Sequence, residues 1–316
     1  MPQTHNPQPR RSHRPAANVQ SPNRAPRPEN KSRMKRFALL TLAAATLFAP
    51  QLLRAQASDL PSAAPAPTPG VTSEQRGRLL LDQMIAALGG DAWLNRTSMQ
   101  LEGRTSSFFH GQPNPYIVEY HAVDRFAASG QPEAERVGFL TDRGMIMPGK
   151  KIDVVQIWKE GHGYEVTFKG QTDLPKEQVD DFYRRKAHSI EAVVKSWIHA
   201  PGVMILAEGT TMVERHLSDK ITLLNAQNDA VTLELDATTH LPMRRSFQWR
   251  NPQFNDFDEE VEDYDDYHTI QGLPTPMTIT RYHNGDMTNQ RYFTKVTYNL
   301  PLAPNLFDPA TLLKKK

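Results

Sequence analysis

The charged residues best placed to do chemistry gather in one stretch near the C-terminal end of the chain. Between residues 256 and 266 the acidic side chains are Asp256, Asp258, Glu259, Glu260, Glu262, Asp263, Asp265 and Asp266. Such a cluster could bind Ca²⁺, a hard cation that takes several oxygen ligands. The stretch lacks the glycine-containing loop of a calcium motif, however, and strand alternation would send Glu260 and Glu262 to one face and Glu259 and Asp263 to the other. We therefore predict a solvated edge strand whose charges discourage aggregation.

The other residue types form no recognisable catalytic motif. The histidines are scattered without a His-Glu-x-x-His pattern, although a zinc site assembled in three dimensions stays open. The sequence contains no Gly-x-Ser-x-Gly elbow, no phosphate-binding glycine loop and no dinucleotide fingerprint. It has no cysteine, which excludes thiol catalysis, disulfides and cysteine-ligated zinc. We predict that the protein is not an enzyme and that it has no catalytic residue, no metal site and no cofactor.

One arginine stands out because its neighbours on the same predicted face are apolar. Alternation over residues 231–250 predicts two strands joined by a polar turn that ends at Pro242. In the second strand, Arg245 shares a face with Met243, Phe247 and Trp249. The simplest interpretation is an arginine on an edge strand whose long side chain reaches water. The apolar face around it must cover something, and what it covers is the functional question.

Strands provide most of the framework that would position these residues. Six antiparallel candidates follow one another with short turns, at residues 221–225, 231–235, 243–249, 259–269, 275–283 and 290–298. The turn Asn284-Gly285-Asp286 is a typical hairpin signal. Shorter strands are predicted before them, at residues 99–109, 116–121, 136–141, 144–147, 153–158 and 164–169. These strands together predict a long antiparallel meander.

Two helices are predicted among the strands. Ser73 is a candidate N-cap for the first, which carries apolar residues at spacings of three and four and ends at Gly89-Gly90. The second can begin at Asp173 and run to about His199, before Ala200-Pro201-Gly202 stops it. Basic residues 184–186 interrupt its apolar side, so we expect a kink or greater exposure in the middle.

The N-terminal region has the composition of a targeting segment. Residues 1–33 are polar and basic and are predicted to be a disordered leader, and one hypothesis is that Met34 is the true start. Residues 34–57 have a basic pair, an apolar stretch and an Ala-Gln-Ala site, which together predict a cleaved secretory signal peptide. Residues 58–72 form a Pro/Ala-rich linker, and residues 73–310 are expected to form a single domain. These features predict a periplasmic protein.

The charge of the chain changes sign once this leader is set aside. Residues 1–57 hold ten Lys or Arg and one acidic residue, and the whole chain has a net charge of +2. The remainder therefore carries about −7 with histidine neutral. A mature chain of that charge is a poor partner for nucleic acid, so we predict no nucleic-acid binding.

The order of elements resembles the periplasmic lipoprotein-carrier superfamily, which includes the outer-membrane lipoprotein-sorting chaperone and its receptor. The residues that carry the resemblance are Asp236-x-x-Thr239-x-x-Pro242, Tyr264-x-x-Tyr267, Gly272 to Pro276, and residues 299–307. The resemblance implies an unclosed β-barrel whose concave face is covered by helices and holds acyl chains. A buried arginine helps to hold the helical lid shut in that family, and Arg245 is a candidate counterpart.

We predict an α+β fold in which a curved antiparallel sheet, an unclosed half-barrel, wraps around helices. The favoured function is binding of a hydrophobic ligand, such as the acyl chains of a lipid or lipoprotein, with envelope proteins and transient membrane contact as further partners. A structural or interaction module with a filled core and, less favoured, a hydrolase are the alternatives. The candidate ligand-binding residues are Met243, Arg245, Phe247, Trp249, Met277, Ile279, Tyr292 and Trp197.

Overall fold

The computed structural model describes residues 70–313 apart from 143–148 and 252. All of these residues belong to one unit of the chain, Ser58–Lys316. The predicted leader, the signal peptide, most of the linker and the predicted strand at residues 144–147 lie outside the described residues. Within the part that is described, no helix is long and apolar enough to cross a membrane.

Thirteen strands form one sheet, in the order β6-β5-β4-β3-β2-β1-β13-β12-β11-β10-β9-β8-β7. Their bounds are β1 (Ser98–Phe109), β2 (Gln112–Arg125), β3 (Ala134–Asp142), β4 (Lys150–Lys159), β5 (His162–Thr167), β6 (Gly170–Asp173), β7 (Met204–Val213), β8 (His216–Leu224), β9 (Ala230–Asp236), β10 (Pro242–Asn251), β11 (Asp256–Ile270), β12 (Leu273–His283) and β13 (Asp286–Tyr298). Every neighbouring pair is antiparallel. The two ends of the order, β6 and β7, remain unpaired with each other, so the sheet does not close.

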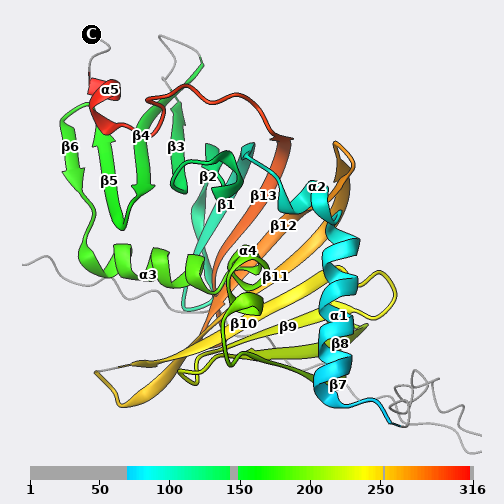
Figure 1. Cartoon of the computed structure of the whole chain (residues 1–316). Helices are drawn as coiled ribbons and strands as arrows, with labels where there is room; N and C mark the ends of the chain where they lie inside the picture. The colour runs from blue at the N-terminus through cyan, green and yellow to red at the C-terminus, as the bar shows by residue number, and fades with distance from the viewer. Residues whose placement is uncertain (1–69, 143–148, 252, 314–316) are drawn as a thin grey trace, which may run out of the picture. The chain divides into compact units, whose positions relative to one another are not determined.

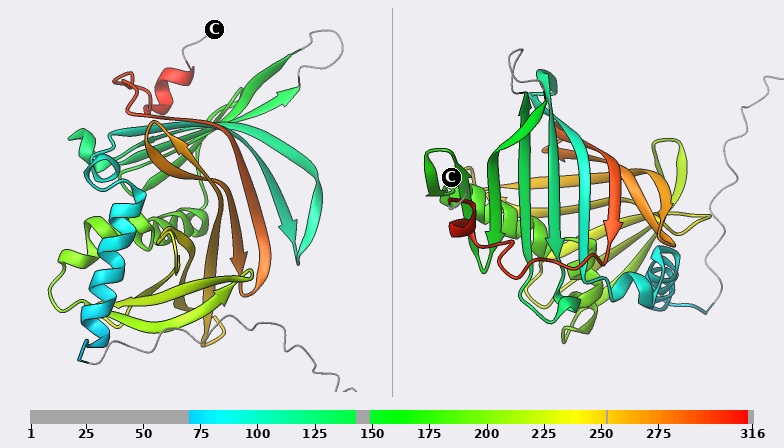
Figure 2. Two further views of the ribbon diagram at one scale, coloured as in Figure 1. Left: turned by 90° about the vertical axis from the view of Figure 1, so that its right-hand side faces the viewer. Right: turned by 90° about the horizontal axis from the view of Figure 1, so that it is seen from above.

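Few helices accompany the sheet. They are α1 (Ser73–Leu88), α2 (Asp91–Leu94), α3 (Lys176–Ala187), α4 (Ile190–Lys195) and α5 (Pro309–Leu313), with short 3-10 helices η1 (Ala127–Ser129) and η2 (Trp197–His199). The segment α3-α4-η2 connects the two edge strands β6 and β7, and with α1 it lies on the concave side of the sheet (Figures 1 and 2). This arrangement confirms the predicted α+β fold with an unclosed antiparallel sheet around helices.

Helix α1 is anchored at both ends by local chemistry. Thr72 is the N-cap of a capping box. Its side-chain hydroxyl accepts from the Gln75 backbone N–H, and the Gln75 side-chain oxygen accepts from the Thr72 backbone N–H. The prediction of Ser73 as the cap was wrong by one residue, and the Ser73 hydroxyl instead donates to the Ala207 carbonyl at 2.7 Å. Gly89 ends the helix in the left-handed conformation at φ 119°.

The main hydrophobic core lies between the helices and the concave face of β7 to β9. Six inward-facing strand residues are fully buried: Ile205, Ile221, Leu223, Val231, Leu233 and Leu235. They pack against Leu81 and Met84 of α1 and Val193 of α4. Burying side chains of this size contributes about 1.5–3 kcal/mol each, which fixes α1 and α4 on this half of the sheet. A smaller core on the opposite face packs Phe307 and Leu312 against Ile157 of β4.

The single long helix predicted from Asp173 to about His199 is divided in the structure. Asp173 ends β6 and Pro175 occupies the N-cap position of α3 without a capping side chain. The break falls at His188 and Ser189, where the Ser189 hydroxyl accepts from the Ala192 N–H at 3.1 Å and so starts a new helix, α4. A strong N-cap inside an otherwise helical sequence explains the difference.

The acidic stretch is not an edge strand, which corrects the prediction. It forms β11, which pairs with β10 on one side and β12 on the other. The predicted alternation is present, but Glu260, Glu262 and Asp263 are buried rather than solvated. Arginines on the neighbouring strands offset the desolvation cost of this burial, since each buried carboxylate lies within salt-bridge distance of at least one of them.

Candidate ligand-binding site

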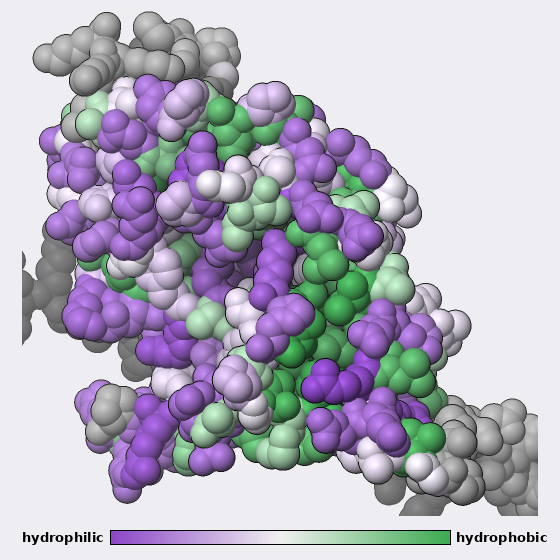
Figure 3. All heavy atoms as spheres, in the orientation of Figure 1, coloured by the Kyte–Doolittle hydropathy of each residue, from purple (hydrophilic) through white to green (hydrophobic). Residues whose placement is uncertain are grey.

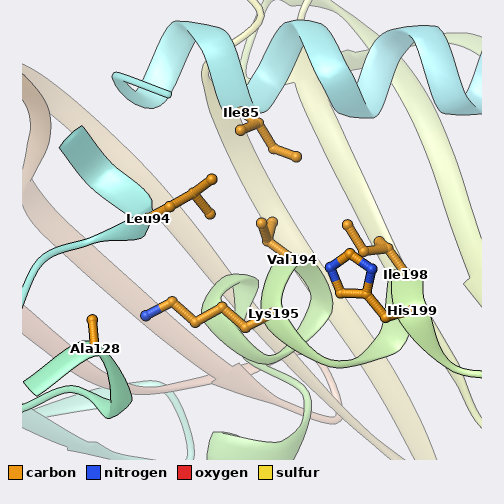
Figure 4. A pocket seen from close by; sticks show the side chains of 7 residues that line it. All are labelled: Ile85, Leu94, Ala128, Val194, Lys195, Ile198 and His199. Atoms are coloured by element: carbon orange, nitrogen blue, oxygen red, sulfur yellow. The ribbon is translucent and has the colours of Figure 1, made fainter. Parts of the chain in front are cut away.

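An apolar pocket of about 400 Å³ opens where the helices meet. Its walls come from α1, α2, η1, α4 and η2, and it is lined by Ile85, Leu94, Ala128, Val194, Lys195, Ile198 and His199 (Figure 4). Five of these seven residues are apolar. In Figure 3 hydrophobic residues gather in the region where α1 faces α4, with hydrophilic residues around them. A concave, mostly apolar pocket with few polar groups is the usual form of a small-ligand site.

The pocket walls are held in place by Arg96, which is only 4% exposed. Its Nε donates to the Trp93 carbonyl of α2 at 2.9 Å, and its guanidinium pairs with Glu191 of α4 at 3.1 Å. The guanidinium also lies over the rings of Trp93 and Phe126, at 4.3 and 4.9 Å from their centroids. Burial alone would raise the pKa of Glu191, but Arg96, a backbone N–H and Lys186 together outweigh that effect and hold the pKa below its ordinary value. One buried arginine therefore fixes α2 relative to α4.

Lys195 is the polar residue that extends along the pocket. Its Nζ atom is buried and makes no hydrogen bond within the described part of the chain. Figure 4 shows the side chain directed past Leu94 toward Ala128, away from His199. The ammonium lies 5.4 Å from the centroid of the Phe126 ring. The pocket thus combines apolar walls with one buried cation.

The concave face also holds a cluster of buried charges at the centre of the sheet. Glu262 of β11 is paired with Arg245 at 2.9 Å, Arg281 at 2.8 Å and Arg291 at 3.3 Å. Glu260 pairs with the same Arg245 at 3.3 Å. Burial would raise the pKa of Glu262, but the three guanidiniums outweigh it and hold the pKa well below the ordinary value.

Arg245 also reaches the helices. It is 1% exposed, and its Nη1 donates to the His188 carbonyl, at the break between α3 and α4, at 3.2 Å. The interpretation of Arg245 as an edge-strand arginine in water is therefore wrong. Strand β10 lies inside the sheet, and the arginine joins β11 to the helical segment above it.

A second charged cluster ties α3 to the other half of the sheet. Lys186 pairs with Glu135 of β3 at 2.7 Å, and Asp124 of β2 lies opposite Glu135 in the register. Burial and the neighbouring Glu135 carboxylate raise the pKa of Asp124 to about 7. Burial would also raise the pKa of Glu135, but Lys186, Arg291 and a hydrogen bond with Asp124 together outweigh it and lower the pKa of that carboxyl. Below about pH 7 a protonated Asp124 therefore lies beside a Glu135 carboxylate that is paired with Lys186.

The eight residues predicted to line a ligand site lie in different environments. Phe247 is buried and stacks on His188, with ring centroids 4.2 Å apart, while Arg184 covers the Trp249 ring at 4.5 Å. Met277 packs against the main core, and Ile279 shares its face, since it lies opposite the concave Arg291. Trp197 of η2 also packs on the core and donates to the Ala187 carbonyl at 3.0 Å.

For two of the eight, the register gives no place on the concave face. Tyr292 pairs with Thr278 on the face opposite Ile279 and Arg291, and it is 40% exposed. Met243 falls at a register shift between Pro242 and Arg244, so strict alternation from Arg245 does not reach it. Ligand contact by any of the eight stays a prediction, and none of them lines the pocket of Figure 4.

Sequence reasoning missed the residues that form this pocket. Ile85, Val194 and Ile198 belong to the apolar stripes of the two predicted helices, and such a stripe does not distinguish a ligand contact from core packing. Lys195 gave a local signal, because a lysine falls among the apolar residues of that stripe, between Val194 and Trp197. Among the described residues, no group of three His, Asp or Glu is placed to hold a metal ion.

Comparison with known proteins gives the fold but not a family by sequence. No protein-family model matches the chain, and no curated protein matches its sequence. A DUF1329 family protein from Desulfovibrio piger superposes with a TM-score of 0.50 at 11% identity, over 77% of this chain and 100% of that one. This chain shares that fold.

Two further solved structures are more distant. A putative outer membrane lipoprotein-sorting protein domain from Vibrio parahaemolyticus has a TM-score of 0.48 at 8% identity, over 76% of this chain and 100% of that one. A LolA superfamily protein from Nitrosomonas europaea has a TM-score of 0.44 at 10% identity, over 76% of this chain and 99% of that one. At these identities both are likenesses of fold alone.

Proposed function

We propose that the protein is an exported, periplasmic binding protein that holds a hydrophobic ligand, such as an acyl chain of a lipid or lipoprotein, without catalysing a reaction. The apolar pocket between α1, α4 and η2 is the observation that carries this proposal. Its volume of about 400 Å³ lies at the small end of the usual range for ligand pockets. Each methylene buried there would contribute about 0.8 kcal/mol to binding.

The helical segment α3-α4-η2 is the part expected to move when a ligand enters. It connects the two edge strands, and several of its contacts with the rest of the fold are ion pairs: Lys186 with Glu135, Glu191 with Arg96, and Arg185 with Glu260. Polar contacts of this kind can be exchanged for water during opening at less cost than buried apolar ones. The segment would therefore act as a lid over the concave face.

Ligand binding by the delipidated protein tests the proposal. Native mass spectrometry and displacement of a fluorescent fatty acid should detect dodecanol or dodecanoate bound at about one per chain. Ile85→Gln, inside the pocket, should weaken binding by about 5- to 30-fold, since it removes about one to two kcal/mol of apolar contact. Leu79→Gln is the matched control, because Leu79 lies on the same helix but is 56% exposed.

The outcomes separate the proposal from its alternative. Binding that Ile85→Gln weakens and Leu79→Gln leaves unchanged supports a carrier with this pocket. If neither amphiphile binds the wild-type protein, the carrier proposal fails, and a structural or interaction module of the envelope becomes the better interpretation.

A further inference from the structure

We propose that Lys195 is an anion-binding residue of this pocket and that the ligand is a single-chain amphiphile with an anionic oxygen head, a carboxylate or a phosphate. The inference rests on the proposed function, since it assigns the ligand class of the same pocket. It starts from the chemistry of one buried ammonium group.

The environment of Lys195 differs from that of the other cations on the concave side. Lys186, Arg96 and Arg245 each have a carboxylate partner within 3.3 Å. The Lys195 Nζ atom is buried with no hydrogen-bond partner in the described chain. An ammonium removed from water without a partner is costly, and the Phe126 ring at 5.4 Å compensates only in part. An anionic ligand group would supply the missing hydrogen bonds.

The rest of the pocket defines the other end of the ligand. Beyond Lys195, the surface is formed by Ile85, Leu94, Val194 and Ile198, which offer only apolar contact. Lys195 is directed toward Ala128, whereas Ile198 and His199 lie at the opposite end in Figure 4. A charged head beside Lys195 with an apolar chain running toward Ile198 fits this polarity. The volume of about 400 Å³ suits one chain rather than several.

A series of ligands with one chain and different heads tests the assignment. Dodecanoate, dodecyl phosphate, dodecanol and dodecyltrimethylammonium are titrated into the full-length mature protein by calorimetry or by displacement of a fluorescent fatty acid. The wild-type protein should bind the two anions about 10- to 100-fold more tightly than dodecanol, as expected for a charge-assisted hydrogen bond. The cationic amphiphile should bind most weakly. The ratio of dodecanoate to dodecyl phosphate affinity distinguishes a free fatty acid from a phosphorylated lipid.

Variants of Lys195 test whether this residue causes the preference for anions. Lys195→Met should lose the 10- to 100-fold preference for the anions while keeping the affinity for dodecanol, and Lys195→Arg should keep most of the preference. Lys176→Met is the matched control, since the Lys176 side chain on α3 is 80% exposed. His199→Gln shows whether His199, the other ionisable residue of the pocket, contributes to the preference for anions. Without ligand, Lys195→Met should be at least as stable as the wild-type protein in urea, because it removes an unpartnered buried charge.

Each outcome decides one question. Equal affinity of the wild-type protein for dodecanoate and dodecanol would overturn the role of Lys195 and leave the hydrophobic carrier intact. If the anion preference survives in Lys195→Met and disappears in His199→Gln, the head group binds at His199, and the proposed role of Lys195 is wrong. Failure of all four amphiphiles to bind would instead reject the proposed function itself. The comparison of heads in the wild-type protein remains decisive even if a Lys195 variant folds poorly.

Discussion

Replacing Glu262 by glutamine should destabilise the fold more than any other conservative change on β11. The Glu262 carboxylate is shared by Arg245, Arg281 and Arg291, at 2.9, 2.8 and 3.3 Å. At an effective dielectric constant of about 20, each pair at these distances has a gross attraction of roughly 5–6 kcal/mol. Desolvation offsets much of that sum, and removing one partner of a buried pair costs about 3–5 kcal/mol in practice. We expect Glu262→Gln to lie at the upper end of that range, because three cations lose the same partner.

Urea denaturation followed by circular dichroism measures this loss of unfolding free energy. The matched control is Glu259→Gln, the same substitution three residues earlier, where the side chain instead bonds Gln248 on the opposite face. This control should lie within about 0.5 kcal/mol of the wild-type protein. If Glu262→Gln and Glu259→Gln have the same midpoint and slope, the buried cluster does not stabilise the fold in the way we describe.

Acid adds a second test of the same residue. The folded-state pKa of Glu262 lies well below the ordinary 4.5, so its contribution is fully present above pH 4.5 and is lost as pH falls through the folded-state value. The wild-type protein should therefore lose stability in that acidic range more steeply than Glu262→Gln. Parallel pH profiles would contradict the assignment.

Three further substitutions test other parts of the structure. Phe247→Ala should lower the unfolding free energy by about 3–5 kcal/mol, because Phe247 is 3% exposed and stacks on His188, whereas Phe257→Ala, at a position 61% exposed, should change it little. Gly77→Ala should cost about 1–3 kcal/mol despite the better helix propensity of alanine, since its Cβ would lie 2.5 Å from the Ile205 carbonyl oxygen, and Gln83→Ala on the same helix is the control. Asp124→Asn should stabilise the protein at pH 8 and have little effect below pH 3.8. The folded-state pKa of about 7 makes wild-type stability fall as pH rises from 3.8 to 7, and equal urea midpoints at pH 8 would refute this.

The sheet was predictable from the sequence because its signals are local. Alternation and turn residues predict all six strands between residues 221 and 298, and each has a counterpart among β8 to β13. The unclosed sheet around helices follows from their order and from the family resemblance. The division of the second helix was only partly visible, since basic residues interrupt its apolar side but do not indicate that a new helix starts at Ser189.

Partners across strands were not predictable in the same way. Alternation correctly places Arg245 on the concave face and Glu260 and Glu262 together on one face of β11. It does not show that these faces coincide, because that depends on the register between β10 and β11 and on which strands are neighbours. The arginine and the acidic stretch were therefore interpreted separately, each as a solvated edge, although each provides the partner that allows the other to be buried.

The pocket depends on even more distant relations. Its residues come from five short segments between Ile85 and His199, and each apolar one fits a core stripe as well as a ligand site. Only the packing of α1 against α4, with Arg96 fixing α2 between them, leaves an apolar space instead of a filled core. A single sequence contains no pattern for such a space.

The charge distribution on the concave side limits what the protein can hold. The centre of the sheet is occupied by Arg245, Glu262 and Arg291, and strands β2 and β3 carry Asp124 and Glu135. An acyl chain laid across these groups would remove them from water or from one another without offering a hydrogen bond, which costs several kcal/mol per charge. A ligand is therefore best accommodated on the helical side, in the apolar pocket, with α3 and α4 closed over the sheet once it has entered. A ligand with several chains would require those helices to leave the sheet, and the Lys186–Glu135 and Arg96–Glu191 ion pairs would have to break first.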